Sequence, residues 1–201
     1  MDEASLEVVR DAQELFSRHM SQAIGIAYRK GLSIPCGKGC FACCFEPAFV
    51  GRQEVDRILH VLGELPADEQ ERVKRAVKAW YEAFDKTTFR DQKEMNVFEY
   101  RAAKLPCPLL KDGKCGVYEA RPIACRGHVA VGERRHCEDD GLRSEQRYLL
   151  SSDMCAEPFA IMARHEDLVF DHLGILLYEA MYGASTPTAA RCGLSVNRGE
   201  K

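Results

Sequence analysis

The sequence lacks the features that would assign the protein to a membrane or to a nucleic acid. No apolar run approaches the roughly 20 residues that a membrane-spanning helix needs. The N-terminal stretch MDEASLEVVRDAQELF carries acids where a secretory signal carries lysine and arginine. The formal net charge is only -3 over 201 residues, so no overall field attracts nucleic acid or an anionic membrane. We therefore expect a cytoplasmic protein that has neither nucleic acid nor a membrane as its partner.

Repeats and strand patterns are also missing. No segment recurs, and no alternation of apolar and polar residues continues beyond a few positions, which argues against a repeat fold and against a large sheet. Apolar residues instead recur at steps of three and four, the spacing of an amphipathic helix. The predicted helices cover residues 3–30, 51–63, 68–84, 91–103, 143–150 and 159–182. Pro158 lies just before the last of these helices and suits a first helical turn. His165 and His172 within that helix are interpreted as ordinary helix residues.

The length and composition suit one domain. Apolar residues make up 46% of the chain, enough for a single core of ordinary size. We predict one mainly α domain over residues 1–183. Residues 184–201 read ASTPTAARCGLSVNRGEK and are small, polar and aperiodic, so we expect a flexible tail there.

Cysteine is the residue that this chain has in excess. It has ten, and in a reducing compartment thiols are usually kept reduced. Four lie in IPCGKGCFACCFEP, residues 34–47, and three in the turn-rich stretch LPCPLLKDGKCGVYEARPIACRGH, residues 105–128. A disulfide framework, a metal or cluster site and a redox relay are the possible uses, and the predicted compartment favours the last two. A disulfide between the adjacent Cys43 and Cys44 would also close a strained ring.

The first cysteine block, residues 36–44, is predicted to begin a helix at CFACCF, because proline and glycine keep residues 35–39 out of a stable one. Cys40 would then share a helical face with Cys43 and Cys44. Backbone N–H groups without partners at a helix start favour the thiolate over the thiol. The three sulfurs could therefore approach a common point as ligands.

The second cysteine block, residues 107–125, must complete the site. The spacing is CxxxCxxCC, then a long gap, then Cys107, Cys115 and Cys125, which matches neither a zinc ribbon nor a ferredoxin. Blocks so far apart have to fold together around one site or two adjacent sites, so metal binding would be part of folding. We predict helices packed around these two irregular cysteine-rich loops, which form a metal or iron-sulfur centre.

Such a centre also needs positive charge nearby. Four thiolates around one divalent ion leave a net charge of about -2, which N–H donors or cations must offset. Lys38, Arg121 and Arg126 are the candidate cations in and beside the two blocks. We interpret Arg121 chiefly as a brace of its own loop and Tyr118 as an anchor in the core.

The run CGKGCFACC, followed much later by CPLLKDGKCGVYEARPIACRGH, resembles the YkgJ-type cysteine cluster family, which carries a CxxCxxCC run and is described as zinc- or iron-chelating. The second stretch is the more specific half, because C-P-x-L and then G-x-C-x-V-Y-E-x-R-P-x-x-C-R match at nearly every framework position. The resemblance covers residues 34–128. One departure is visible: three residues separate Cys36 from Cys40 where the family pattern has two.

The resemblance implies a metal or iron-sulfur centre whose ligands are cysteines from both blocks. The implied ligands are Cys40, Cys43, Cys44, Cys115 and Cys125, with Cys36 and Cys107 close by. We prefer iron over zinc as the cofactor, since this many clustered cysteines exceed what one tetrahedral zinc uses. An iron-sulfur cluster or a two-metal site would use more of them.

Neighbouring residues offer further nitrogen and sulfur donors. His128 follows Cys125 by three positions and His136 precedes Cys137, so either histidine could complete a mixed shell. A hydrogen-bonded or solvated role is the commoner one for a single histidine. Cys137 and Cys155 are either ligands or buried thiols with no such role.

Three classes of function are open. A metal-binding protein would leave its ligands exposed, an iron-sulfur enzyme would need an adjacent pocket, and a structural zinc module mediating protein interaction would unfold on chelation. A flagellin lysine methylase is similar across the motif and is associated with an iron-sulfur centre and S-adenosylmethionine. No Gly-rich strand-to-helix loop supports an adenosylmethionine site here, and the radical-enzyme spacing CxxxCxxC belongs to a β/α barrel that these helices cannot build. We expect a metal ion or cluster as the partner, and the sequence identifies no protein partner.

Overall fold

The computed structural model describes residues 2–37, 39–87, 97–139, 147–151, 153–163, 168–184 and 192–194. Most of these residues are helical, which confirms the predicted mainly α class. None of the helices described is both long and apolar enough to cross a membrane. The helices are α1 (Glu3–Arg29), α2 (Arg52–Gly63), α3 (Ala67–Phe84), α4 (Val97–Ala102), α5 (Ile123–Gly127), α6 (Arg135–Glu138), α7 (Asp153–Ala163) and α8 (Leu173–Tyr182), with the 3-10 turns η1 (Ala42–Phe45) and η2 (Tyr118–Ala120). The strands are β1 (Phe49–Gly51), β2 (Leu110–Lys111), β3 (Lys114–Cys115), β4 (Ala130–Val131), β5 (Arg147–Tyr148), β6 (Leu168–His172) and β7 (Cys192–Leu194).

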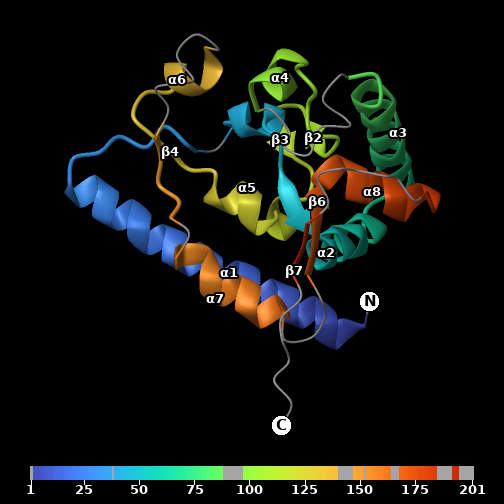
Figure 1. The fold of residues 1–201 in the computed structure, drawn as a ribbon, viewed down its shortest axis with the longest axis horizontal. Helices are drawn as coiled ribbons and strands as arrows, with labels where there is room; N and C mark the ends of the chain where they lie inside the picture. The colour runs from blue at the N-terminus through green and yellow to red at the C-terminus, as the bar shows by residue number, and fades with distance from the viewer. Residues whose placement is uncertain are drawn as a thin grey trace.

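The long helix α1 runs along one side of the molecule with α7 beside it (Figure 1). Its start is capped by Asp2, whose carboxylate accepts a hydrogen bond from the N–H of Ser5 at 2.8 Å. Its end is followed by Gly31, which has a φ of +73° that suits a residue without a side chain. The buried face of α1 includes Phe16, which shares a hydrophobic cluster with Met162 of α7. The predicted first helix is confirmed.

Helices α2, α3 and α8 surround a second core (Figure 1). The helices predicted over residues 51–63 and 68–84 are confirmed, except that α3 begins at Ala67 after Pro66 and is not capped by Asp68. Proline suits this place because its fixed φ is compatible with a helix start. The buried side chains of this core include Val55, Ile58, Leu62, Val73, Val77, Leu173, Leu176 and Leu177.

His172 lies at the junction of β6 and α8, buried at 3% exposure. Its ring stacks on Trp80, with centroids 4.7 Å apart and planes at 7°, and the ring of Tyr100 lies 5.2 Å away. Its Nδ1 accepts a hydrogen bond from the N–H of Gly174 at 3.1 Å, so His172 caps α8. The interpretation of His172 as an ordinary helix residue is therefore wrong, and His165 lies outside the described residues.

The prediction of one helix over residues 159–182 is also wrong. Helix α7 ends at Ala163, strand β6 follows from residue 168, and Pro158 lies inside α7, not in a first turn. Strand β6 pairs antiparallel with β1 on one side and with β7 on the other, so part of the predicted flexible tail joins a sheet. The apolar residues of the run LVFDHLGILLYE are spaced in a way that fits either a buried strand or a helix, so their spacing alone could not distinguish the two.

Two further predicted helices are only partly described. Of the helix predicted over 91–103, residues 97–102 form α4, and its beginning lies outside the described residues. Of the helix predicted over 143–150, residues 147–148 form strand β5 and pair with β4. That prediction is wrong over its described part.

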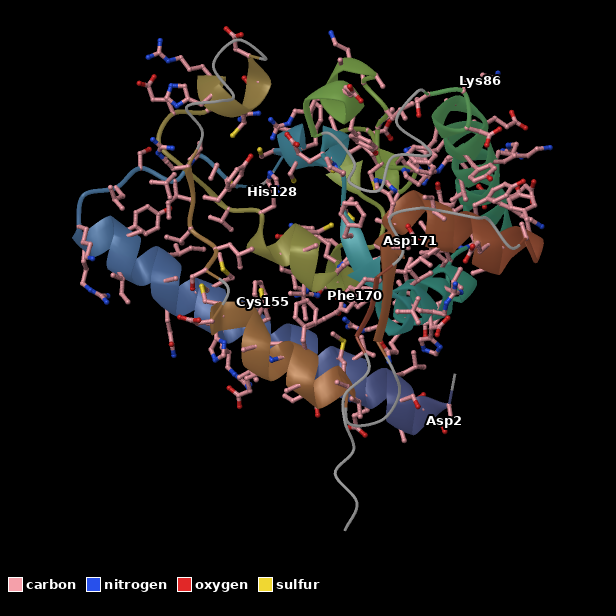
Figure 2. The ribbon with its side chains drawn as sticks, in the orientation of Figure 1. Asp2, Lys86, His128, Cys155, Phe170 and Asp171 are labelled. Atoms are coloured by element: carbon pink, nitrogen blue, oxygen red, sulfur yellow. The ribbon has the colours of Figure 1, made fainter. Side chains whose placement is uncertain are left out.

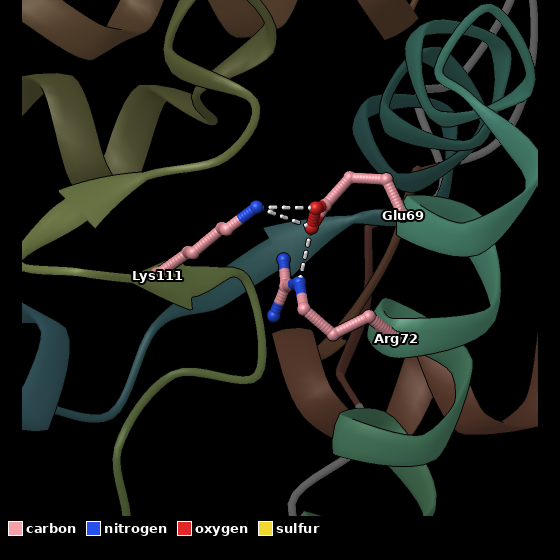
Figure 3. Close-up of polar contacts among 3 residues, drawn as sticks. All are labelled: Glu69, Arg72 and Lys111. Carbon is pink, nitrogen blue, oxygen red and sulfur yellow. Dashed lines mark hydrogen bonds and ion pairs between the residues drawn. The ribbon is translucent and has the colours of Figure 1, made fainter.

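An ion cluster clamps the hairpin β2–β3 to α3 (Figure 3). Glu69, in the first turn of α3, accepts hydrogen bonds from the Lys111 ammonium at 2.6 and 2.9 Å and from the Arg72 guanidinium. These cations, Lys111 first, lower the pKa of the Glu69 carboxyl. Asp112 and Gly113 turn the hairpin with φ values of +49° and +70°, which is typical of a two-residue type I′ turn. The clamp therefore fixes the second cysteine block relative to α3.

Candidate metal centre

The first cysteine block is a set of tight turns. The N–H groups of Cys40 and Cys44 donate to carbonyls three residues earlier, at 3.0 and 2.9 Å. Among the described residues of this block only η1 is helical, and the backbone becomes extended at the residue before Pro47, where proline disfavours a helix. Cys40 lies before η1. A helix therefore does begin inside CFACCF, but it is a short 3-10 helix that starts at Ala42, and the helical face that Cys40 would share with Cys43 is wrong.

The second cysteine block folds back on itself and is fastened by Arg126. The Arg126 Nε donates to the carbonyl of Arg121 at 2.6 Å, and its Nη2 to the carbonyl of Glu119 at 2.5 Å. Its Nη1 donates to the hydroxyl of Ser17 on α1 at 2.9 Å. Arg126 thus braces the loop, the role that the sequence analysis gave to Arg121, and its contact with Ser17 ties the loop to α1.

A backbone hydrogen bond joins the two blocks. The N–H of Cys107 donates to the carbonyl of Cys44 at 2.7 Å, the short end of the range for such bonds. Burial raises the pKa of all three thiols of the second block, to about 12 for Cys125, and the charge of Cys43 raises each of them further. Cys43 is therefore within electrostatic reach of Cys107, Cys115 and Cys125.

Arg121 brings a positive charge to these thiols. Burial raises the pKa of Cys36, Cys115 and Cys125. The pKa of Cys43 is raised first by a hydrogen bond with Cys44 and then by burial. At all four thiols the positive charge of Arg121 opposes the rise in pKa. The Arg121 Nε is buried with no hydrogen-bond partner among the described residues. Its guanidinium lies 4.2 Å from the ring of Tyr118. Tyr118 is 60% exposed, so the prediction that it anchors the core is wrong, and the candidate cation Lys38 lies outside the described residues.

A small cavity lies beside the first block. It measures about 20 Å³, enough for one water-sized guest. Three cysteines of the first block line it together with two histidines and one cysteine from the segment after the second block. These side chains are Cys36, Cys40, Cys43, His128, His136 and Cys137.

Cys36 stays with the block despite the additional residue between it and Cys40. Its Sγ accepts a hydrogen bond from the N–H of Ala130 in β4 at 3.2 Å. Burial is the main reason that the pKa of Cys36 is raised, and the charges of Cys40 and Cys43 raise it further. The departure from the family spacing therefore does not remove Cys36 from its neighbours.

The structure separates the donors whose role the sequence left open. His128, His136 and Cys137 line the cavity, whereas Cys155 packs with the core between α1 and α7, away from His128 (Figure 2). The adjacency of His136 and Cys137 in the sequence was the signal for this part of the lining. Among the described residues, no three His, Cys, Asp or Glu side chains are close enough together to hold a metal ion as they stand.

A buried carboxylate, which the sequence analysis did not identify, positions the helix that carries Cys125. Glu54 is 1% exposed and accepts hydrogen bonds from the N–H of Ile123 at 2.7 Å, the N–H of Gly51 at 3.1 Å and the Nε2 of Gln13 at 3.2 Å. Burial raises its pKa, and these donors oppose the rise. A glycine followed three residues later by glutamate, the spacing of a capping box, was the available signal.

One comparison with known proteins matches this chain. The family model described as "CxxCxxCC: Putative zinc- or iron-chelating domain" matches residues 35–156, more than half of the chain. The matched residues contain both cysteine blocks, His128, His136 and Cys137. No curated protein and no solved structure matches the chain.

Proposed function

The chain belongs to the CxxCxxCC family, and from this premise we propose that it binds iron or zinc through its two cysteine blocks. The proposed ligands are Cys36, Cys40, Cys43, Cys44, Cys107, Cys115 and Cys125. Thiolates are soft ligands, and zinc and iron-sulfur clusters are among the centres that they select. The donor set therefore agrees with the metals in the family description.

The hydrogen bond from Cys107 to Cys44 is the observation that carries this proposal. It joins two segments that are far apart in the sequence, and both are rich in thiols. Thiols pack as small apolar groups wherever a core needs them, so scattered cysteines alone would support no centre. Two thiol-rich segments in direct contact are the arrangement that a shared centre requires.

Arg121 supports the proposal through charge. A centre of four thiolates and one divalent ion is anionic by about two charges, and the guanidinium of Arg121 already opposes the raised pKa values of thiols from both blocks. Its buried Nε, for which the described residues supply no acceptor, could donate to a thiolate sulfur. A buried donor without a partner costs free energy, and an anionic centre would remove that cost.

Metal binding would also draw the thiols together. The thiols of the described residues do not yet converge on one point, but the first block consists of tight turns and one short 3-10 helix, which can adjust without breaking a long helix. A metal that recruits ligands from both blocks would couple binding to the final closure of the site. We prefer iron, because the proposed cysteines exceed the four ligands of one tetrahedral zinc.

The test is to purify the protein anaerobically and to quantify iron, zinc and acid-labile sulfide alongside its visible spectrum. We expect stoichiometric iron, with sulfide and a visible chromophore if a cluster forms. A colourless protein with one zinc and no sulfide would exclude the cluster and keep the metal proposal. A protein with neither metal, purified from metal-replete cells, would contradict the proposal itself.

A pair of variants tests the joint role of the two blocks. The double variant Cys43→Ser, Cys125→Ser removes one thiol from each block, and we expect it to lose most of its metal. Cys155→Ser is the matched control, because Cys155 is a half-buried thiol on α7 outside both blocks. Equal metal content in the double variant and the control would contradict a centre built from both blocks.

A further inference from the structure

A groove lies next to the cysteine cavity and has the dimensions of a small-molecule site. It measures about 320 Å³, at the lower end of the roughly 300–1,000 Å³ of ligand pockets. Its lining comes from η1, α4 and α6 and the residues beside them. The principal side chains are Phe41, Phe45, Arg101, Lys104, Arg134 and Cys137.

The groove is basic in a chain that is acidic as a whole. Three cations and one carboxylate, Glu138, line it, whereas the chain carries a net charge of -3. Arg134 pairs with Glu138 at 2.6 Å, and Arg101 pairs with the buried Glu46 at 2.5 Å. Lys104 forms no ion pair with any described residue and is exposed. A groove with an excess of positive charge attracts an anion.

Two aromatic rings form the apolar side of the groove. Phe41 is 40% exposed, and its ring centroid lies 6.5 Å from that of Phe45 with the planes inclined at 50°. A Cβ added at Gly113 would lie 3.2 Å from the Phe41 ring, so this ring packs closely on the hairpin turn. The exposed face of Phe41, which is fixed in this way beside the half-buried Phe45, suits the flat face of a ring.

We propose that this groove binds a small organic anion that carries a flat apolar ring. The cations would contact the anionic group, and Phe41 and Phe45 would contact the ring. Cys137 and Ala42 line both the groove and the cysteine cavity, so the bound molecule would lie beside the proposed centre. The lining itself does not depend on a metal, and the proposal stands without one.

Calorimetric titration of the purified protein tests the proposal with two anions that share this chemistry, 2-naphthoate and 2-naphthyl phosphate. Neutral 2-naphthylmethanol carries the ring without the charge, and inorganic phosphate carries the charge without the ring. We expect at least one of the two anions to bind about tenfold more tightly than either half, because charge-assisted contacts and ring burial act together. Binding of the carboxylate alone or of the phosphate alone supports the proposal and identifies the preferred head group.

The decisive variant is Lys104→Glu, with Lys86→Glu as its matched control. Lys86 is an exposed lysine just beyond the end of α3 and is not among the residues that line the groove. Charge reversal in the groove should weaken binding about tenfold or more, and the control should not change it. Equal affinity in the two variants, equal affinity for the neutral analogue, or no binding of either anion would overturn the proposal.

Metal content measured in the same samples separates this proposal from the metal-binding one. Neither lysine is a proposed metal ligand, so both variants should keep the metal of the unaltered protein. A protein that holds metal and binds neither anion contradicts the groove proposal alone. A protein that binds an anion and holds no metal contradicts the metal proposal alone.

Discussion

The stability of the protein at acid pH depends on the buried imidazole ring of His172. Burial lowers the pKa of His172 from 6.5 to about 3, because a charged imidazolium among Trp80, Phe84 and Tyr100 would lose its hydration. The unfolded chain therefore binds this proton first as the pH falls. The contribution of His172 to stability is complete above about pH 6.5 and is lost progressively between pH 6.5 and about 3.

The corresponding prediction concerns the pH dependence of unfolding. Between pH 7 and pH 5 the unaltered protein should lose about 2 kcal/mol of unfolding free energy that His172→Asn does not lose, since asparagine does not titrate. An asparagine oxygen can replace the Nδ1 acceptor, although the ring stacking is lost. Urea unfolding at the two pH values measures the difference, and His60→Asn, at an exposed position on α2, should behave like the unaltered protein. Parallel losses in all three proteins would show that His172 does not carry the effect.

Gly174 is a second residue whose role follows from one distance. A Cβ placed there would lie 2.4 Å from the Trp80 ring, whereas nothing lies within 4 Å of a Cβ at Gly63. We expect Gly174→Ala to destabilise the protein by about 1–3 kcal/mol through overpacking. Gly63→Ala should be close to neutral. Thermal unfolding of the two variants compares them directly, and similar midpoints would mean that the Trp80 ring moves aside at little cost.

Among the elements, α5 depends on contacts from outside itself. It contains few residues, so its own hydrogen bonds cannot hold it in place. Glu54 of α2 accepts the N–H of Ile123 at its start and also bonds Gln13 of α1. One carboxylate thus connects three helices and positions Cys125 within the second block.

Replacement of this carboxylate tests the connection. Glu54→Gln puts an amide N–H₂ among groups that are all donors, so we expect a loss of about 1–3 kcal/mol in unfolding free energy. Hydrogen exchange at the Ile123 amide should also become faster. Glu64→Gln, an exposed position just past the end of α2, is the control. Unchanged exchange in Glu54→Gln would contradict the role of Glu54 in positioning α5.

The elements also show which parts of the fold the sequence could predict. Helices α1 to α3 were predictable because each carries one continuous apolar face. The strand β6 was not, because its partners β1 and β7 lie far away in the chain and are only three residues long. Strand pairing over such distances leaves no local pattern. The same reason explains the wrong helix at residues 147–148, which pair with β4.

On the scale of the whole molecule, the proposed metal should act as a stabilising ligand. Binding to the folded state alone adds about 2.7 kcal/mol when free metal exceeds the dissociation constant a hundredfold. A chelator should therefore lower the unfolding midpoint of the unaltered protein, and added metal should restore it. The double variant Cys43→Ser, Cys125→Ser should show no such shift in scanning calorimetry. An equal shift in that variant would assign the metal to other residues.

The candidate site was predictable in its chemistry and less so in its geometry. Residue type and spacing identified two thiol-rich blocks, and the family match supports metal binding. The cavity lined by His136 and Cys137 and the brace made by Arg126 depend on how distant segments pack. The adjacency of His136 and Cys137 marks them as possible donors, but no spacing in a single sequence encodes how they pack against the first block.

The contact between Cys107 and Cys44 also has a consequence for synthesis. The two residues are 63 positions apart (107 − 44), and ribosomes add about 5–20 residues per second. Cys44, the last of the first four thiols, therefore leaves the ribosome about 3 to 13 s before Cys107 does. During that interval these thiols lack the backbone partner and the Arg121 charge that the second block supplies. A newly made chain thus presents four of its ten thiols to passing metal ions and oxidants before the second block exists.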